Sequence, residues 1–133
     1  MERPGGHPDI PQRKIGVLLV NLGTPDAPTP AAVKRYLAEF LSDRRVVELP
    51  PILWQPILRG VVLNTRPKKS AAAYAKVWTE RGSPLDYLTE DLKRALEGTF
   101  GPGVVVDHAM RYGNPALPAR FGALRDAGCE RIL

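Results

Sequence analysis

Short, unbroken apolar runs alternate along the chain with segments whose apolar residues recur at helical spacing. This alternation predicts an α/β fold, because buried parallel strands are apolar throughout while helices bury one face. The first run, Ile15–Val20, and a second, Val104–Met110, predict adjacent parallel strands. Glu130–Leu133 begins what we expect to be a third strand, and the strand–helix–strand order indicates right-handed parallel connections.

Helix signals stand between these runs. Thr29 and Pro30 form a good helix start, with a capping hydroxyl followed by a proline at the first helical position. Apolar residues then share one face of this helix, namely Val33, Tyr36, Leu37, Phe40 and Leu41. A second helix is expected to start near Pro56, and a separate one to cover Lys68–Trp78.

Two further helices are expected nearer the end of the chain. Ser83 opens the first through a capping-box pattern, and this helix runs to about Glu97. Its inward stripe is expected to consist of Leu85, Leu88, Leu92 and Leu96. Asn114 and Pro115 start the second helix, and Gly128 is well placed to end it. Its inward residues are expected to be Leu117, Phe121 and Leu124.

The segment 51–63, named the apolar lip from here on, is crowded with large apolar residues, and Arg59 is its only charged residue. Two interpretations of it remain open at this point. One is an exposed interfacial surface, which we favour, and the other is an ordinary buried helix.

Composition changes this picture in only a few respects. The formal net charge of +5, from 19 Lys and Arg against 14 Asp and Glu, fits a solvated surface or a partner that carries carboxylates, phosphates or anionic lipid. The positive residues are scattered, which disfavours nucleic acid. Residues 1–13 are polar and predict a flexible tail before a domain over residues 14–133. Without an apolar leader or a bilayer-spanning run, a cytoplasmic location is the expectation.

Spacing rules identify little chemistry by themselves. The chain has no phosphate loop and no G-x-G-x-x-G fingerprint, which disfavours a dinucleotide-binding domain. The lone Cys129 cannot form an internal disulfide or hold a metal by itself. His7 and His108 lack the neighbouring ligands of a metal site, and His108 is expected to be a hydrogen-bonded structural residue in a strand.

Several motifs stand in a consistent order between Lys14 and the last residue. They are V-N-L-G-T-P-D-A-P-T-P-A-A-V-K-R-Y-L-A-E-F-L-S-D-R-R-V-V from Val20, L-W-Q-P-I-L-R-G-V-V-L from Leu53, Y-A-K-V-W from Tyr74, G-S-P-L from Gly82 and R-Y-G-N-P from Arg111. In sequence and spacing these motifs resemble the N-terminal part of bacterial ferrochelatases, to roughly two-fifths of the family's chain length.

The resemblance implies an enzyme that inserts ferrous iron into protoporphyrin IX in the terminal step of haem biosynthesis, a lyase. It implies a three-layer, parallel-sheet, Rossmann-like half of a class II chelatase, truncated within its first domain. The family's catalytic histidine and glutamate are then expected beyond Leu133, so the chain alone is expected to be inactive. Its partners are the porphyrin, the remainder of the chain and a peripheral contact with the inner membrane. No cofactor and no iron–sulfur cluster are expected.

The same resemblance suggests roles for individual residues. Leu22 is expected to pack on the macrocycle, and Arg66 and Ser83 to bind the propionates. Arg111 and Tyr112 are expected to line the inner cleft. The lip residues expected to face the porphyrin or the membrane are Leu53, Trp54, Ile57 and Leu58.

Plainer interpretations stay open for these residues. Arg66 could be a solvated loop arginine, and Ser83 a plain helix cap, which is the reading we favour for it. For Arg111 and Tyr112, the alternative is that they do no more than shape the turn before Asn114. For Asp43-Arg44-Arg45 we expect a surface ion-pair cluster. For the protein as a whole, the alternatives are a coproporphyrin ferrochelatase and a non-catalytic module that binds porphyrin or docks on a membrane.

Overall fold

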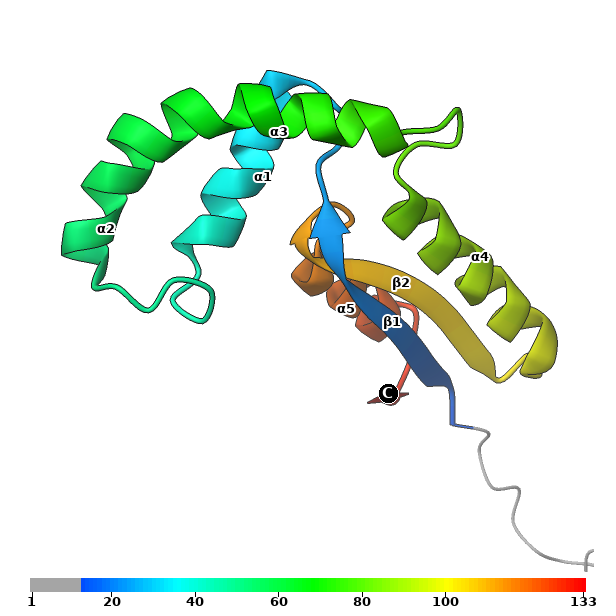
Figure 1. The fold of residues 1–133 in the computed structure, drawn as a ribbon. Helices are drawn as coiled ribbons and strands as arrows, with labels where there is room; N and C mark the ends of the chain where they lie inside the picture. Colours follow the sequence, from blue (N-terminus) through cyan, green and yellow to red (C-terminus); the bar gives the residue numbers. More distant parts are fainter. Residues whose placement is uncertain (1–12) are drawn as a thin grey trace, which may run out of the picture.

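A parallel sheet forms the centre of the protein in the computed structural model, which describes residues 13–133 (Figure 1). Its strands are β1 (Ile15–Thr24), β2 (Val104–Gly113) and β3 (Arg131–Ile132), in the order β2-β1-β3. The predicted adjacent parallel pairing is confirmed, with Val17 opposite Val106 in register. The predicted tail lies outside the described residues except for Arg13, and so does His7.

Helices α4 (Pro84–Thr99) and α5 (Leu117–Asp126) cover opposite faces of this sheet. Successive side chains of a strand point to opposite faces, and on β2 they reach different helices. Asp107 forms its closest ion pair, at 3.2 Å, with Arg120 of α5 and a longer one, at 3.8 Å, with Lys93 of α4, whereas the next residue, His108, lies 3.7 Å from Asp86 of α4. The three-layer α/β arrangement expected from the sequence is therefore present.

A long helical arm lies beyond the carboxyl ends of the strands (Figure 1). It contains α1 (Pro30–Ser42) and, packed along it, the consecutive segments α2 (Pro51–Ile57), η1 (Leu58–Val62) and α3 (Leu63–Val77). Thr29 caps α1 as predicted, because its hydroxyl accepts a hydrogen bond from the Ala32 N–H at 3.4 Å.

The predicted starts of the two middle helices are wrong. Helical backbone begins at Pro51 and continues to Val77, so that Pro56 and Pro67 lie inside helices. A proline inside a helix removes one hydrogen bond and crowds the preceding turn. The wider η1 turn lies between the two prolines, and a π-turn is one of the ways in which a helix absorbs such a disruption. Packing of this segment on α1 outweighs the local breaking tendency.

The main core lies between α1, the lip and α3, with one residue from the sheet. Its buried members are Val33, Tyr36, Leu37, Leu41, Leu58, Leu63, Ala71 and Tyr112. Leu58 is fully buried, so the expectation that it belongs to an exposed lip is wrong for this residue. The helical period turns Leu58 towards α1 while it turns Leu53 outward.

Two expected inward stripes are wrong in part. Leu88 and Leu92 of α4 are 58% and 52% exposed, and Phe121 of α5 is 48% exposed. In each case the sheet covers a narrower face of the helix than the apolar pattern suggested. Helix α4 packs on the sheet through Thr89, which is buried and hydrogen-bonded to Asn21 at 3.2 Å.

The end of α5 is as predicted. Gly128 has φ 91°, a conformation that favours glycine, and its N–H donates to the Arg125 carbonyl at 3.0 Å. The following residue, Cys129, donates its N–H to the Leu124 carbonyl at 3.1 Å. These bonds close the helix and turn the chain into β3.

Burial of Leu58 leads to a stability prediction. Leu58→Ala should lower the free energy of unfolding by about 2–5 kcal/mol, because it leaves a cavity in the core. Leu53 lies in the same segment but is 60% exposed, so Leu53→Ala is the matched control. It should change the free energy of unfolding by no more than about 0.5 kcal/mol. Urea denaturation followed by circular dichroism measures both, and equal effects would contradict the assignment of Leu58 to the core.

Candidate functional site

The carboxyl ends of β1 and β2 meet beside each other, and the chain leaves them towards opposite faces of the sheet. The loop after β1 leads by way of the arm to α4, whereas the loop after β2 leads to α5. Open α/β sheets bind their ligands in the crevice formed where neighbouring connections diverge in this way. The candidate site therefore lies at the ends of these two strands.

Gly23 permits an unusually close approach of the two strand ends. Its φ is 121°, and an added Cβ would lie 1.9 Å from the Tyr112 carbonyl oxygen. Only glycine fits here, because any side chain would collide with the β2 backbone. Pairing consequently continues to Thr24 opposite Gly113, at the mouth of the crevice.

Three of the predicted porphyrin-binding residues come together at this edge. Leu22 is 52% exposed and lies between two paired positions, Asn21↔Met110 and Gly23↔Tyr112, which places it beside Arg111. The guanidinium of Arg111 lies 4.9 Å from the centre of the Tyr112 ring. The arrangement places an exposed apolar side chain next to a cation stacked on an aromatic ring.

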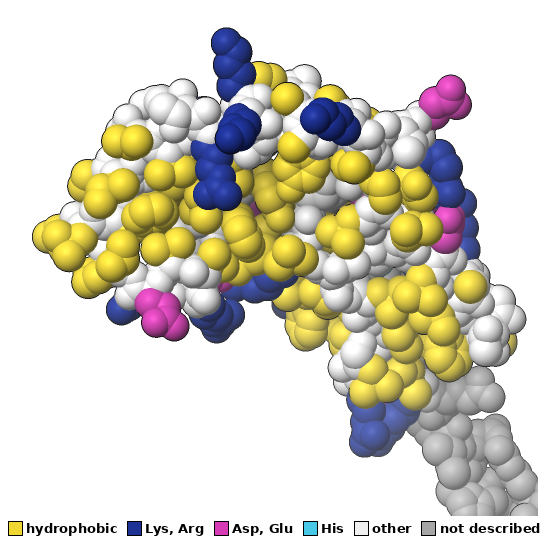
Figure 2. Space-filling view, viewed as in Figure 1, with side chains coloured by type: hydrophobic (Ala, Val, Ile, Leu, Met, Phe, Trp, Pro, Cys, Tyr) yellow, Lys and Arg dark blue, Asp and Glu magenta, His cyan; other side chains and the backbone are white. Residues whose placement is uncertain are grey.

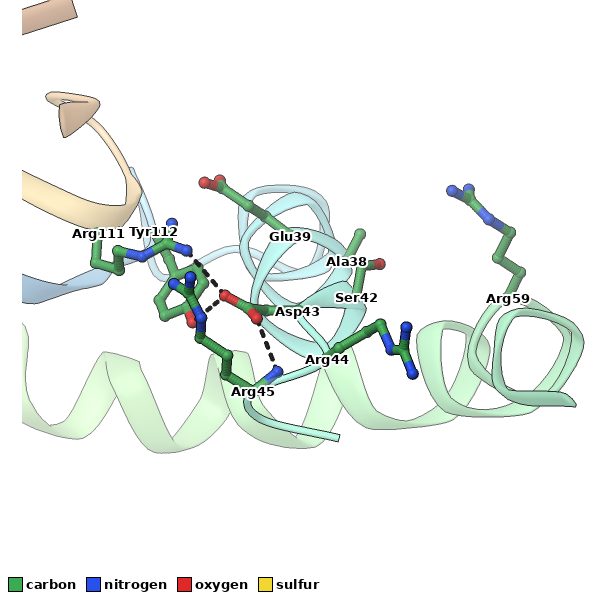
Figure 3. Close-up of a pocket in the computed structure, with 9 residues that line it drawn as sticks. All are labelled: Ala38, Glu39, Ser42, Asp43, Arg44, Arg45, Arg59, Arg111 and Tyr112. Atoms are coloured by element: carbon green, nitrogen blue, oxygen red, sulfur yellow. Dashed lines mark hydrogen bonds and ion pairs between the residues drawn. The ribbon is translucent and has the colours of Figure 1, made fainter. Parts of the chain in front are cut away.

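Asp43, which follows α1, is bonded to both of these β2 residues (Figure 3). Its Oδ2 accepts hydrogen bonds from the Tyr112 hydroxyl at 2.7 Å and from Arg111 Nη2 at 3.0 Å. Its Oδ1 accepts from the Arg45 N–H at 2.9 Å. The surface ion-pair cluster expected at this position is therefore incomplete as a description, because Asp43 ties α1 to the end of β2.

The bond between Asp43 and Tyr112 shifts the protonation of both groups. The hydrogen bond from the Tyr112 hydroxyl, followed by that from the Arg45 N–H, holds the pKa of Asp43 below its usual value. The same bond to Asp43 raises the pKa of Tyr112. Asp43 is thus charged and Tyr112 neutral near neutral pH.

An open pocket of about 710 Å³ surrounds this cluster. Figure 3 shows its lining, which consists of Ala38, Glu39, Ser42, Asp43, Arg44, Arg45, Arg59, Arg111 and Tyr112. Arginines outnumber the carboxylates among these residues, so the pocket is positively charged overall. Such a pocket suits a ligand that carries anionic groups.

Ser83 lies elsewhere, in a separate and more polar pocket of about 370 Å³ that also contains Asp26 and Asp86. Its hydroxyl is buried and bonded to the Thr24 hydroxyl at 2.8 Å. Ser83 is the N-cap residue of α4, as the favoured interpretation has it, but its hydroxyl makes no capping hydrogen bond to the helix. The hydroxyl joins the helix start to the end of β1 instead.

Tyr36, which the sequence suggested only as a core residue, stabilises the close approach of Gly23 to the β2 backbone. Its hydroxyl donates to the Gly23 carbonyl at 3.1 Å, and burial raises its pKa to about 12. Neither Tyr36 nor Asp43 could be assigned to the site from local spacing, because their partners come from other parts of the chain.

The remaining predicted residues lie on the arm. Arg66 is exposed to solvent, as its plainer interpretation has it, but it lies on helix α3 and not in a loop. In the lip, Ile52 is 84% exposed, and Leu53 and Ile57 are also exposed. Trp54 is only half-buried, and its indole N–H donates to the Leu41 carbonyl at 2.7 Å, which anchors α2 to α1. In Figure 2 hydrophobic side chains gather over this end of the arm.

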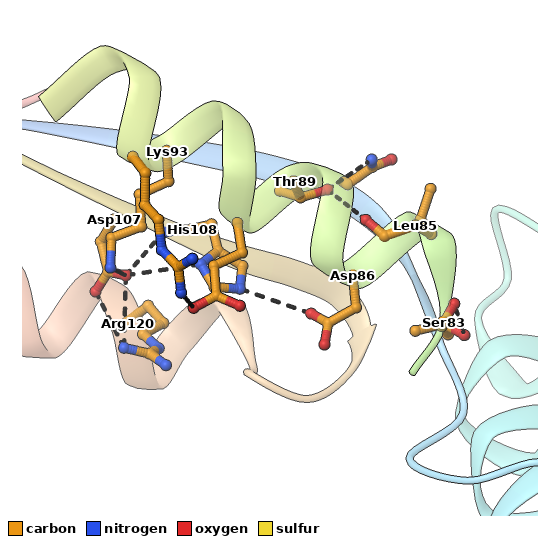
Figure 4. A network of polar contacts seen from close by, with 12 residues as sticks. Ser83, Leu85, Asp86, Thr89, Lys93, Asp107, His108 and Arg120 are labelled. Carbon is orange, nitrogen blue, oxygen red and sulfur yellow. Dashed lines mark hydrogen bonds and ion pairs between the residues drawn. The ribbon is translucent and has the colours of Figure 1, made fainter. Parts of the chain in front are cut away.

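His108 is buried in β2 beneath α4, as Figure 4 shows. Its Nδ1 has no hydrogen-bond partner, so the expected hydrogen-bonded role is wrong for this atom. Asp107 lies 3.2 Å from Arg120 and 3.8 Å from Lys93 in the same polar network. Within residues 13–133, no group of three or more His, Cys, Asp or Glu side chains is placed to hold a metal ion.

Fold and site together define an α/β protein of the parallel-sheet class with an open pocket at the carboxyl ends of its strands. The ferrochelatase family model matches residues 14–133. The chain belongs to the ferrochelatase family.

Individual relatives agree with this assignment. Over 127 residues the chain is 54% identical to "Ferrochelatase 1" of Shewanella oneidensis, which covers 92% of the chain and 38% of that relative. It is 57% identical over 122 residues to a ferrochelatase of Azoarcus sp. and 56% identical over 124 residues to one of Idiomarina loihiensis, in each case over 90% of the chain and 34% of the relative. The chain thus spans little more than a third of the length of these proteins.

Proposed function

We propose that the chain forms the N-terminal part of the porphyrin cleft of an enzyme that inserts ferrous iron into protoporphyrin IX. The observation that carries this proposal is the wall formed at the ends of β1 and β2 by the exposed Leu22 and by Arg111, whose guanidinium stacks on the buried Tyr112 ring. A flat apolar macrocycle requires an apolar and aromatic surface, and its propionates require cationic or hydroxyl donors. Membership of the ferrochelatase family supports the same ligand.

Arg66 is proposed to bind a propionate. Its guanidinium is exposed on α3 and forms no hydrogen bond or ion pair with another residue in the described part of the chain. An arginine fork can pair with a carboxylate through two parallel hydrogen bonds. Ser83 is a weaker candidate, because its hydroxyl is buried and already bonded to Thr24.

Iron insertion requires a base that removes the pyrrole protons at the centre of the ring, and we propose that this base lies outside the present chain. His108, the histidine of the described residues, is buried in β2 under α4 and away from the strand ends. The site described here binds and orients the ring. If coproporphyrin were the substrate, the same wall would be needed together with more cationic or hydroxyl donors, because that porphyrin carries more propionates.

The apolar lip is proposed to touch the inner face of the cytoplasmic membrane through Ile52, Leu53 and Ile57, which are exposed on one helical segment. Exposed apolar side chains next to arginines are typical of an interfacial segment. No helix of residues 13–133 is long and apolar enough to cross a bilayer. The proposal is therefore peripheral attachment.

The chain alone is expected to insert no iron above the uncatalysed rate while binding protoporphyrin IX weakly, because it supplies one wall without the base. Anaerobic ferrous-iron insertion, followed through the porphyrin absorption spectrum, measures the first part, and quenching of tryptophan fluorescence measures the second. Addition of a separately made segment with the rest of a family relative is the positive control. Turnover by the chain alone would overturn the assignment of the base, and absence of porphyrin binding would overturn the proposed function.

Arg66→Ala should weaken binding of protoporphyrin IX by roughly tenfold or more, because a charge-assisted hydrogen bond to a carboxylate is lost. The same substitution should leave binding of the dimethyl ester almost unchanged. Lys68→Ala, also exposed on α3, is the matched control for a change in overall charge. An equal loss for both ligands would show that Arg66 acts in some way other than through a propionate.

Replacement of Ile52 and Leu53 by Ser should reduce binding to vesicles of phosphatidylcholine and phosphatidylglycerol by about tenfold or more, since two inserting apolar side chains are lost. The control pair is Leu88 and Leu92, two apolar residues that are also exposed but lie on α4. Their replacement by Ser should not change binding in a vesicle sedimentation assay. Equal losses for the two pairs would argue against a specific role of the lip.

A further inference from the structure

Asp43 is held in place by its own backbone. Its N–H donates to the Phe40 carbonyl at 3.4 Å at the end of α1, and its carbonyl accepts from the N–H groups of Val46 and Val47 at 2.9 and 3.0 Å. The Asp43 side chain is only 14% exposed. The turn after α1 therefore fixes the Asp43 backbone, and the hydrogen bond from the Arg45 N–H to Oδ1 orients its carboxylate.

The two β2 side chains are oriented by this fixed carboxylate. Tyr112 donates its hydroxyl to Asp43, and its ring meets Phe40 edge-on with centroids 5.0 Å apart. Arg111 donates to the same Oδ2 and stacks on the Tyr112 ring. Without Asp43 the guanidinium would lose its anchor and, being 43% exposed, could turn into the pocket.

Arg111 differs from the other arginines of the pocket in the balance of charge around it. The carboxylate of Asp43 lies against Arg111 and compensates its positive charge. The other charged residues around Tyr112 in this pocket are Glu39, whose Oε2 accepts from the Gly113 N–H, and Arg44, Arg45 and Arg59. Among the arginines of this pocket, Arg111 is thus the one that already forms an ion pair with a side-chain carboxylate.

We propose that Asp43 is a positioning residue that holds Arg111 and Tyr112 as a wall for the uncharged face of the porphyrin and prevents Arg111 from capturing a propionate. The proposal rests on the function proposed above and adds a determinant of specificity to it. It distinguishes Arg111, a compensated wall residue, from Arg66, an uncompensated carboxylate partner.

The first measurement does not depend on porphyrin. The titration of the Tyr112 phenol is obtained from ultraviolet difference spectra between the chain and its Tyr112→Phe variant. In the parent it should lie above the ordinary tyrosine value of 10.0, because Asp43 accepts the phenol hydrogen, and Asp43→Asn should lower it towards that value. Asp91→Asn, which removes the carboxylate of the exposed Arg81–Asp91 pair elsewhere, is the matched control and should leave it unchanged.

The second measurement is the affinity for protoporphyrin IX relative to its dimethyl ester, both dispersed in the same mild detergent. Asp43→Asn should raise the ratio in favour of the free acid roughly two- to fivefold, because Arg111 becomes an uncompensated cation. The gain should disappear when Arg111→Gln is added, since Asp43 acts through Arg111. A structural role alone would weaken both ligands equally.

The outcomes separate this proposal from the proposed function. An unchanged ratio in folded Asp43→Asn, or a gain that persists without Arg111, overturns the specificity role. If the chain binds neither porphyrin, the proposed function fails, and the Tyr112 titration then decides the positioning role by itself. If Asp43→Asn does not fold, the parent titration decides, because a Tyr112 phenol that titrates at the ordinary value contradicts the bond to Asp43.

Discussion

The close approach of Gly23 to the Tyr112 carbonyl is the constraint on which the site depends. Because no side chain intervenes, β1 and β2 stay paired to their last residues, and Tyr36 fixes the junction through its bond to the Gly23 carbonyl. The exposed Leu22 and the Arg111–Tyr112 stack are thereby brought to one edge of the sheet. A bulkier residue at position 23 would separate the strand ends and with them the wall of the cleft.

The arm adds the second structural element, and a single helical segment serves two purposes in it. One side of the lip contributes Leu58 to the core, and Trp54 donates a hydrogen bond to α1. The other side leaves Ile52 and Leu53 exposed. Since the inner side fixes the segment on α1, the outer side is a rigid apolar surface, which suits contact with a membrane or a flat ligand.

The two arginines expected to contact the porphyrin have different electrostatic surroundings. Arg111 is compensated by Asp43, which the turn after α1 holds in place, whereas Arg66 projects from α3 without such a partner. Arg111 lines the pocket at the strand ends, whereas Arg66 lies outside that pocket on the arm. The raised pKa of Tyr112 and the lowered pKa of Asp43 follow from the same short bond.

The sequence by itself determined the parallel strands, the cap of α1, the Gly128 end of α5 and the family, because these depend on local apolar runs, capping residues and ordered motifs. Only the tertiary structure decided that helical backbone persists through Pro56 and Pro67, that Leu58 is buried while Leu88 and Leu92 are not, and that Ser83 bonds to Thr24. It also decided that Asp43 bonds to Arg111 and Tyr112, which follow it in the sequence by 68 and 69 positions. These features depend on which surfaces other elements cover, and an apolar or charged residue has the same local pattern whether or not a partner lies against it.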